Sequence, residues 1–159
     1  CGLLVIIAAR AARDGASLSE IEALVRAAVP RTVTYGVFGT LEYLYKGGRI
    51  GRAQAFLGSV LKLNPILAIR AGEILPIARV RTRPKAIERL CEILRASGIP
   101  QEMSVMSTTE PEEAEALAQR LAPLFPPQRM YRAHIGPTMG TYVGPGAVGV
   151  SVIWKEKQI

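Results

Sequence analysis

Apolar residues recur at helical spacing over the first part of the chain. Leu3, Leu4 and Ile7 begin a series that continues through residue 11, and Asp14 with Gly15 interrupts it. A second apolar stripe runs over residues 21–28, preceded by Ser17 and Glu20 in the spacing of a capping box. Spacings of three and four residues are typical of amphipathic helices. We therefore predict two helices, the second ending before Pro30.

The remainder of the chain alternates between β-branched runs and helical stripes. Strands are predicted over residues 32–38, 102–107, 129–135 and 147–153, and a hairpin joins 65–70 to 73–81 through Ala71-Gly72. Helices are predicted over residues 40–45 and 53–61, from Pro84 to Gly98, and from a Thr109/Glu112 capping box to Leu121. Residues 136–146 are rich in glycine and are predicted to be a connecting loop. This order favours an α/β (α+β) fold, with helices packed on a mixed, partly antiparallel sheet.

Length and composition are those of one globular domain. The chain has 159 residues, of which 49% are hydrophobic and 21% are charged, an ordinary balance for a folded domain. No apolar run approaches the ~20 residues that a membrane-spanning helix needs. The first residue is Cys1 rather than methionine, so we expect residues 1–159 to be a piece of a longer protein. Cys1 and Cys91 form no CxxC pair, which fits a reducing cytoplasm.

Positive charge is concentrated in the middle of the chain. The net charge is +7, and residues 46–85 contain nine basic residues and one acid, Glu73. Such a block suits an anionic ligand, an acidic partner or simply a solvated face. A nucleic-acid-binding module is the alternative that this charge raises. Aromatic residues are only 6% of the chain, and no nucleic-acid-binding motif is recognised.

Catalytic patterns are missing from the sequence. There is no GxSxG elbow, HExxH pair, Walker loop or dinucleotide fingerprint. His134 is the only histidine and is interpreted as a structural or surface residue, so we expect no metal site and no enzyme activity. Glu112 and its acidic neighbours stand at a predicted helix start, where the helix dipole accounts for them.

Two glycine-bearing segments carry the strongest chemical signal. The first, LEYLYKGGRIG, places the adjacent Gly47 and Gly48 before Arg49, whose guanidinium suits a carboxylate or phosphate. The second, residues 136–146, surrounds Thr141 and Tyr142 with glycines that include Gly144 and Gly146. Such a loop is costly to order unless something binds or packs against it.

These segments resemble the C-terminal domain of the DegV family. LEYLYKGGRIGRA, LNPILAIRAGEILPIARVRTRPKAIERL and TYVGPGAVGV follow that family's LxxLxKGGRI, its RxRxxKA segment and its THxGPGAxG loop in order. The resemblance covers essentially the whole chain. It implies a cytoplasmic bacterial carrier that holds a long-chain fatty acid between two domains and presents its carboxylate to a fatty acid kinase. On this resemblance, residues 1–159 are expected to be the C-terminal lipid-binding domain, without the N-terminal domain.

The resemblance also implies site residues. Arg49, Thr141 and Tyr142 are expected at the lipid head group, with Gly47, Gly48, Gly144 and Gly146 as ligand-loop glycines. Tyr142 stands where the family usually has histidine, and a phenol donates a hydrogen bond without adding positive charge near neutral pH. Arg79, Arg81 and Arg83 alternate along a predicted strand, so they are expected on one face as a docking surface for the partner.

Overall fold

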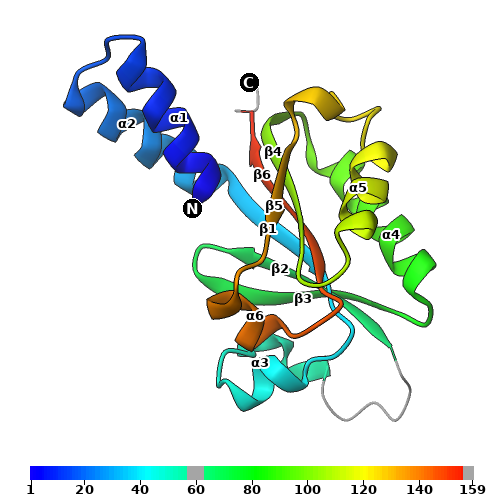
Figure 1. Cartoon of the computed structure of the whole chain (residues 1–159). Coiled ribbons are helices and arrows are strands. Elements are labelled where there is room, and N and C mark those ends of the chain that lie inside the picture. The colour runs from blue at the N-terminus through cyan, green and yellow to red at the C-terminus, as the bar shows by residue number, and fades with distance from the viewer. Residues whose placement is uncertain (57–62, 156–159) are drawn as a thin grey trace.

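Six strands form one sheet in the computed structural model, which describes residues 1–56 and 63–155 (Figure 1). The order is β3-β2-β1-β6-β4-β5, and every neighbouring pair is antiparallel except β4 with β5. The strands are β1 (Thr32–Val37), β2 (Asn64–Arg70), β3 (Glu73–Val80), β4 (Pro100–Ser107), β5 (Tyr131–His134) and β6 (Val148–Trp154). The predicted fold class is thus confirmed.

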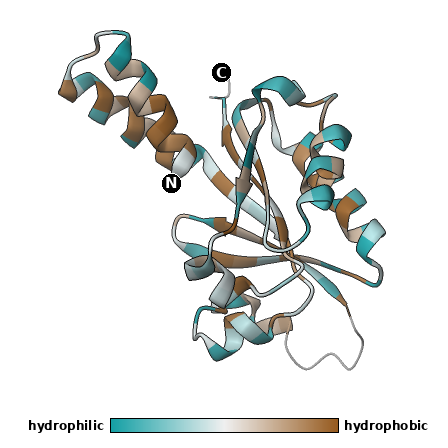
Figure 2. Cartoon of the chain, in the orientation of Figure 1, coloured by the Kyte–Doolittle hydropathy of each residue, from teal (hydrophilic) through white to brown (hydrophobic). Residues whose placement is uncertain are grey.

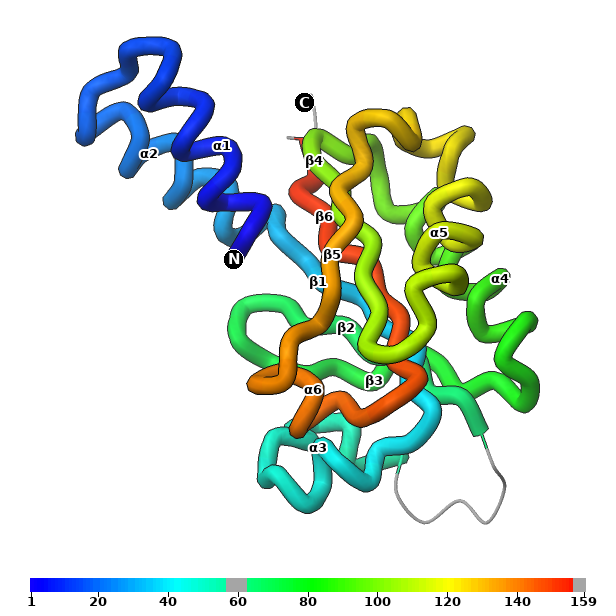
Figure 3. Tube along the Cα trace, in the orientation of Figure 1, coloured from blue at the N-terminus to red at the C-terminus, as the bar shows by residue number. Residues whose placement is uncertain are grey.

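Helices lie on both faces of this sheet. They are α1 (Gly2–Arg13), α2 (Leu18–Ala28), α3 (Glu42–Lys46), α4 (Arg83–Ser97), α5 (Pro111–Arg120) and α6 (Pro137–Val143), with short 3₁₀ turns η1 (Val29–Arg31), η2 (Gly51–Phe56) and η3 (Pro127–Arg129). The trace in Figure 3 shows α5 leading from β4 to β5, which lets these two strands run parallel.

The larger core lies between the sheet and helices α4 and α5. Val33, Tyr35 and Val37 alternate along β1 and point to this side, where they meet Leu90 of α4 and Leu117 of α5. Period-two burial of this kind is what a strand with one covered face requires. The apolar stripe predicted for the helix after Pro84 is confirmed, because its members are buried in this core.

The α1–α2 hairpin packs on the opposite face near one end of the sheet, and Figure 2 shows hydrophobic residues along both of its helices. Arg10 Nη1 donates to Glu102 Oε1 at 2.6 Å, and the guanidinium also donates to the hydroxyl of Tyr131. The Glu102 side chain is only 7% exposed, and a buried carboxylate needs such partners. The predicted Ser17–Glu20 capping box is present at the start of α2.

Two local predictions were wrong, and a third is tested only in part. Residues 136–146 contain helix α6, which Pro137 opens at its first turn. The Thr109/Glu112 capping box is absent: α5 starts at Pro111 with Glu110 as its N-cap and no side-chain cap. The Thr109 hydroxyl instead accepts a hydrogen bond from the Gly146 amide at 3.0 Å. The helix predicted over 53–61 begins as the 3₁₀ turn η2, and its part after residue 56 lies outside the described residues.

The Ala71-Gly72 hairpin is confirmed, and β2 and β3 pair across it from Arg70↔Glu73 onward. Both turn residues have positive φ, 51° at Ala71 and 80° at Gly72. Two consecutive left-handed residues are what a two-residue hairpin turn demands, because they match the twist of the strands. This hairpin forms the sheet edge beside η2.

Candidate functional site

A cavity of about 480 Å³ lies on one face of the sheet. This face is opposite the one covered by α4 and α5, and we call it the cavity face. Strands β1, β2 and β6 form its floor, and residues of α3, α6 and their connecting segments form its walls. The lining is mainly apolar and includes Leu44, Leu67, Ile74, Met106 and Ile135. Its size falls in the range of small-molecule sites, which are concave, apolar and supplied with a few polar groups.

The two glycine motifs meet at this cavity. A Cβ added to Gly47 would come within 2.8 Å of Cε1 of Tyr142 and closer still to Cδ1. In the reverse direction, a Cβ added to Gly144 would come within 2.8 Å of Cε2 of Tyr43. Each motif therefore supplies a glycine on which the other motif's tyrosine ring packs. This reciprocal contact, the tyrosine–glycine lock, fixes α3 against α6.

Arg49 stands on the rim of the cavity. Its guanidinium carbon lies 5.5 Å from the centroid of the Tyr142 ring, a cation–π distance. Nearby cations are occupied: Lys46 pairs with Glu42 at 2.6 Å, which lowers the pKa of that carboxyl, and Arg52 lies 3.7 Å from Glu73. Within the described part of the chain, Arg49 has no carboxylate partner and lines the cavity. It is therefore placed to receive an anion.

Thr141 does not line the cavity. Its hydroxyl donates to the backbone carbonyl of Pro137 at 2.9 Å, one turn earlier in α6. Thr141 is thus held by its own helix, whereas Tyr142, the next residue, turns into the cavity. The structure brings Arg49 and Tyr142 together as predicted and leaves Thr141 on the outer side.

The glycine loop after α6 is held by the loop after β4. The Thr108 amide donates to the carbonyl of Ala147 at 2.9 Å, and the Ala147 amide donates to the Thr108 hydroxyl at 3.0 Å. Thr109 bonds to Gly146 next to it. Gly48 and Gly146 have φ of 65° and 69°, a region that favours glycine. The predicted ligand-loop glycines therefore shape the cavity wall from outside, and none of them lines it.

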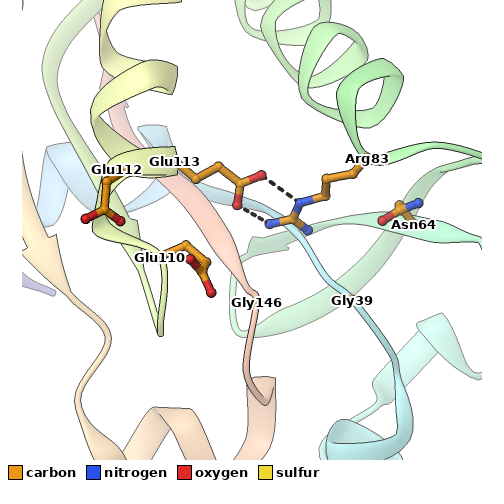
Figure 4. Close-up of a pocket in the computed structure, with 7 residues that line it drawn as sticks. All are labelled: Gly39, Asn64, Arg83, Glu110, Glu112, Glu113 and Gly146. Atoms are coloured by element: carbon orange, nitrogen blue, oxygen red, sulfur yellow. Dashed lines mark hydrogen bonds and ion pairs between the residues drawn. The ribbon is translucent and has the colours of Figure 1, made fainter.

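The predicted arginine face is not formed as expected. Strand β3 ends at Val80, so Arg83 is the first residue of α4 rather than a strand residue. Arg83 makes a bidentate pair with Glu113, with N–O distances of 2.8 and 2.5 Å (Figure 4). Arg79 lies 4.8 Å over the ring of Phe56, and Arg81 is exposed. The helix start at Arg83 breaks the alternation on which the prediction rested.

Figure 4 shows a second, shallower pocket around this pair. Glu110 and Glu112 line it together with Asn64, Gly39 and Gly146. Because Arg83 is engaged with Glu113, the remaining charge of this pocket is acidic. The block of basic residues over 46–85 is thus not one cationic surface, and the nucleic-acid alternative gains no support from it.

His134 was missed as a site residue. Sequence reasoning treated it as structural because it has no histidine or cysteine neighbours. In the structure it ends β5 and lines the same cavity as Arg49 and Tyr142. The sequence motifs give no signal for His134, because it reaches the cavity only through the pairing of β5 with β4.

The cavity lining combines apolar side chains with a few polar groups. Across the described residues, no group of three or more His, Cys, Asp or Glu side chains could hold a metal ion. None of the described helices has the length and apolar character to cross a membrane. An apolar cavity whose lining includes Arg49, His134 and Tyr142 suits an amphipathic anion.

The fold and this cavity define a domain with a six-stranded mixed sheet, helices on both faces and an apolar cavity against the sheet. A family model described as "Uncharacterised protein, DegV family" matches residues 1–155. A DegV domain-containing protein of Streptomyces coelicolor is 38% identical over 154 residues, which are 95% of this chain and 55% of that protein. The chain belongs to the DegV family.

Solved structures agree with this assignment. A DegV family protein from Thermus thermophilus, described for its fatty acid binding, is 29% identical with a TM-score of 0.87 over 97% of this chain and 56% of that one. DegV from Bacillus subtilis, described as a fatty acid binding protein, is 32% identical with a TM-score of 0.79, again over 97% and 56%. The chain thus spans about half the length of the relatives it matches.

Proposed function

We propose that this chain binds a long-chain fatty acid, with the tail in the cavity and the carboxylate at Arg49 and Tyr142. The observation that carries the proposal is the stacking of Arg49 on Tyr142 at the rim of an apolar cavity. Fatty acid binding by the relatives from Thermus thermophilus and Bacillus subtilis supports it. The protein acts as a carrier rather than as an enzyme.

The energetics divide between the two ends of the ligand. Each methylene moved out of water contributes about 0.8 kcal/mol, so the tail supplies most of the affinity. The carboxylate must keep hydrogen-bond partners, because an unpaired charge near apolar walls is costly. Arg49 supplies a forked cation and Tyr142 a hydroxyl, which together fix the depth of the head group.

We further propose that a second domain closes the cavity. Relatives are nearly twice as long as this chain. The cavity face also carries polar residues, such as Thr34 and Ser151, whose hydroxyl oxygens lie 2.7 Å apart in a hydrogen bond. A titration of the isolated chain and of the longer protein with the same fatty acid tests this. The isolated chain is expected to bind more weakly, and equal affinities would rule out a site shared between domains.

The Tyr142 hydroxyl is the first target for mutation. Tyr142→Phe keeps the ring that packs on Gly47 and stacks under Arg49, and it removes only the donor. We expect fatty acid affinity to fall by about 1–3 kcal/mol, the cost of leaving a polar partner unsatisfied. Unfolding measurements serve as the control, since stability is expected to stay the same. Unchanged affinity would reduce Tyr142 to a packing residue.

Presentation of the carboxylate to a fatty acid kinase is a separate proposal. Of the three arginines predicted to dock the partner, Arg81 is exposed, whereas Arg83 is held by Glu113. We expect Arg81→Glu to leave the amount of bound fatty acid unchanged and to impair phosphorylation by a kinase from the same cell. Arg89→Glu, on the exposed side of α4, is the matched control. Loss of bound lipid with normal phosphorylation would reject the docking role of Arg81.

A further inference from the structure

His134 is a titratable cavity residue that the proposed function leaves unused. It ends strand β5, where it pairs with Ser107 of β4, and it lines the cavity together with Arg49 and Tyr142. Its side chain is exposed and makes no hydrogen bond or ion pair with any described residue. Both imidazole nitrogens are therefore available to a ligand.

The charged groups around His134 are otherwise engaged. On its own strand, Arg132 is bound bidentately by Glu115 of α5 at 2.8 and 2.9 Å, an interaction that lowers the pKa of Glu115 to about 2. On β4, Glu102 is paired with Arg10 toward the other end of the strand.

The other elements around the cavity leave few further charges. At the start of α5, Glu113 is paired with Arg83, and Glu110 and Glu112 line the separate pocket of Figure 4. Helix α6, which follows β5, contains no residue that is charged at neutral pH. The remaining titratable groups of the cavity lining are Arg49, Tyr35 and Tyr142.

We infer that His134 is a second ligand for the carboxylate and that its protonation tightens binding as the pH falls. This rests on the proposed function, since it concerns the head group of the same ligand. Arg49 and Tyr142 come from the α3 and α6 side, whereas His134 comes from the end of the sheet. The imidazole would thus approach the carboxylate from the end of β5, which belongs to neither glycine motif.

The direction of the pH effect follows from charge. Histidine is the side chain whose charge changes near neutral pH, and protonation turns the neutral imidazole into a cation. A fatty acid carboxyl stays ionised near neutral pH. The bound anion attracts the protonated form, so affinity rises as pH falls. His134 is the histidine of the described cavity lining, and its substitution tests whether the slope comes from it.

The experiment is a titration of the protein with decanoate at pH 6, 7 and 8, repeated with His134→Gln. We expect wild-type affinity to be about five-fold tighter at pH 6 than at pH 8, near the upper limit for a partly exposed ion pair. The Gln variant keeps a polar side chain and is expected to show no slope. 1-Decanol is the matched ligand without a carboxylate, and its binding is expected to be independent of pH in both proteins.

Each outcome separates the inference from the proposal beneath it. Decanoate binding that is flat in wild type, or a slope that survives in His134→Gln, overturns the role of His134 and leaves fatty acid binding intact. A slope seen equally with 1-decanol also overturns it, because the carboxylate is then not involved. If decanoate does not bind at any pH, the same series is run with a long-chain fatty acid and its matched alcohol. Absence of binding there as well overturns the proposed function, and the inference with it.

Discussion

Arg49→Ala is expected to weaken fatty acid binding by about 1.5–3 kcal/mol, a loss of roughly ten-fold to more than one hundred-fold. The guanidinium is the cavity-lining cation without a carboxylate partner among the described residues, and it is held over the Tyr142 ring. Removing it leaves the bound carboxylate with one neutral donor from the two glycine motifs. Isothermal titration with a long-chain fatty acid measures the effect.

Two further variants sharpen this test. Arg49→Lys keeps the charge but loses the planar fork and its stacking, so an intermediate loss is expected. Arg52→Ala is the matched control, because Arg52 is a neighbouring exposed arginine that lies beside Glu73 and outside the cavity lining. Equal affinity of Arg49→Ala and wild type, or an equal loss in Arg52→Ala, would contradict a specific role for Arg49.

Gly144→Ala is expected to be the most destabilising substitution at the site, lowering the free energy of unfolding by about 2–4 kcal/mol. Two costs combine. The φ of 74° is strained for any residue with a Cβ, and the new methyl group would overlap the Tyr43 ring. Chemical denaturation measures the loss, and fatty acid affinity is expected to fall with it because α6 carries Tyr142.

Gly146→Ala separates the two costs. Gly146 lies in the same loop with a φ of 69°, but a Cβ there meets nothing within 4 Å. Only the strain of roughly 1–2 kcal/mol should remain. In a Tyr43→Ala background, the cost of Gly144→Ala is expected to fall but to stay above that of Gly146→Ala, because φ 74° with ψ 177° at Gly144 is a region open essentially to glycine alone. Equal costs at Gly144 and Gly146 in the wild-type background would mean that the tyrosine–glycine lock contributes nothing.

Much of the fold was predictable because local patterns and tertiary structure agree. The strand over residues 32–38, the Ser17 capping box and the Ala71-Gly72 hairpin are each decided by neighbouring residues, and each is found. The association of Arg49 with Tyr142 was predictable only through the resemblance. No spacing rule connects two loops so far apart in sequence.

The errors share a physical cause, which is that long-range partners override local preference. Helix α6 contains Pro137 and Gly140 and is flanked by Gly136 and Gly144, so its helix propensity is poor. Tyr142 and Val143 pack against α3 and stabilise it. Thr109 is a residue type that often caps helices. In the structure its hydroxyl instead accepts a hydrogen bond from the Gly146 amide, which is distant in sequence. Arg83 was predicted to continue the alternation of a strand, but it is the first residue of α4 and pairs with Glu113.

The central claim is that the cavity holds the tail while Arg49 holds the carboxylate. A crystal of the protein with a long-chain fatty acid brominated at its terminal carbon tests both ends at once, because anomalous scattering locates the bromine. We predict the bromine inside the cavity lined by Leu44, Leu67 and Ile74, and a carboxylate oxygen about 3 Å from the Arg49 guanidinium. A bromine outside this cavity, or a carboxylate that contacts neither Arg49 nor Tyr142, would contradict the account.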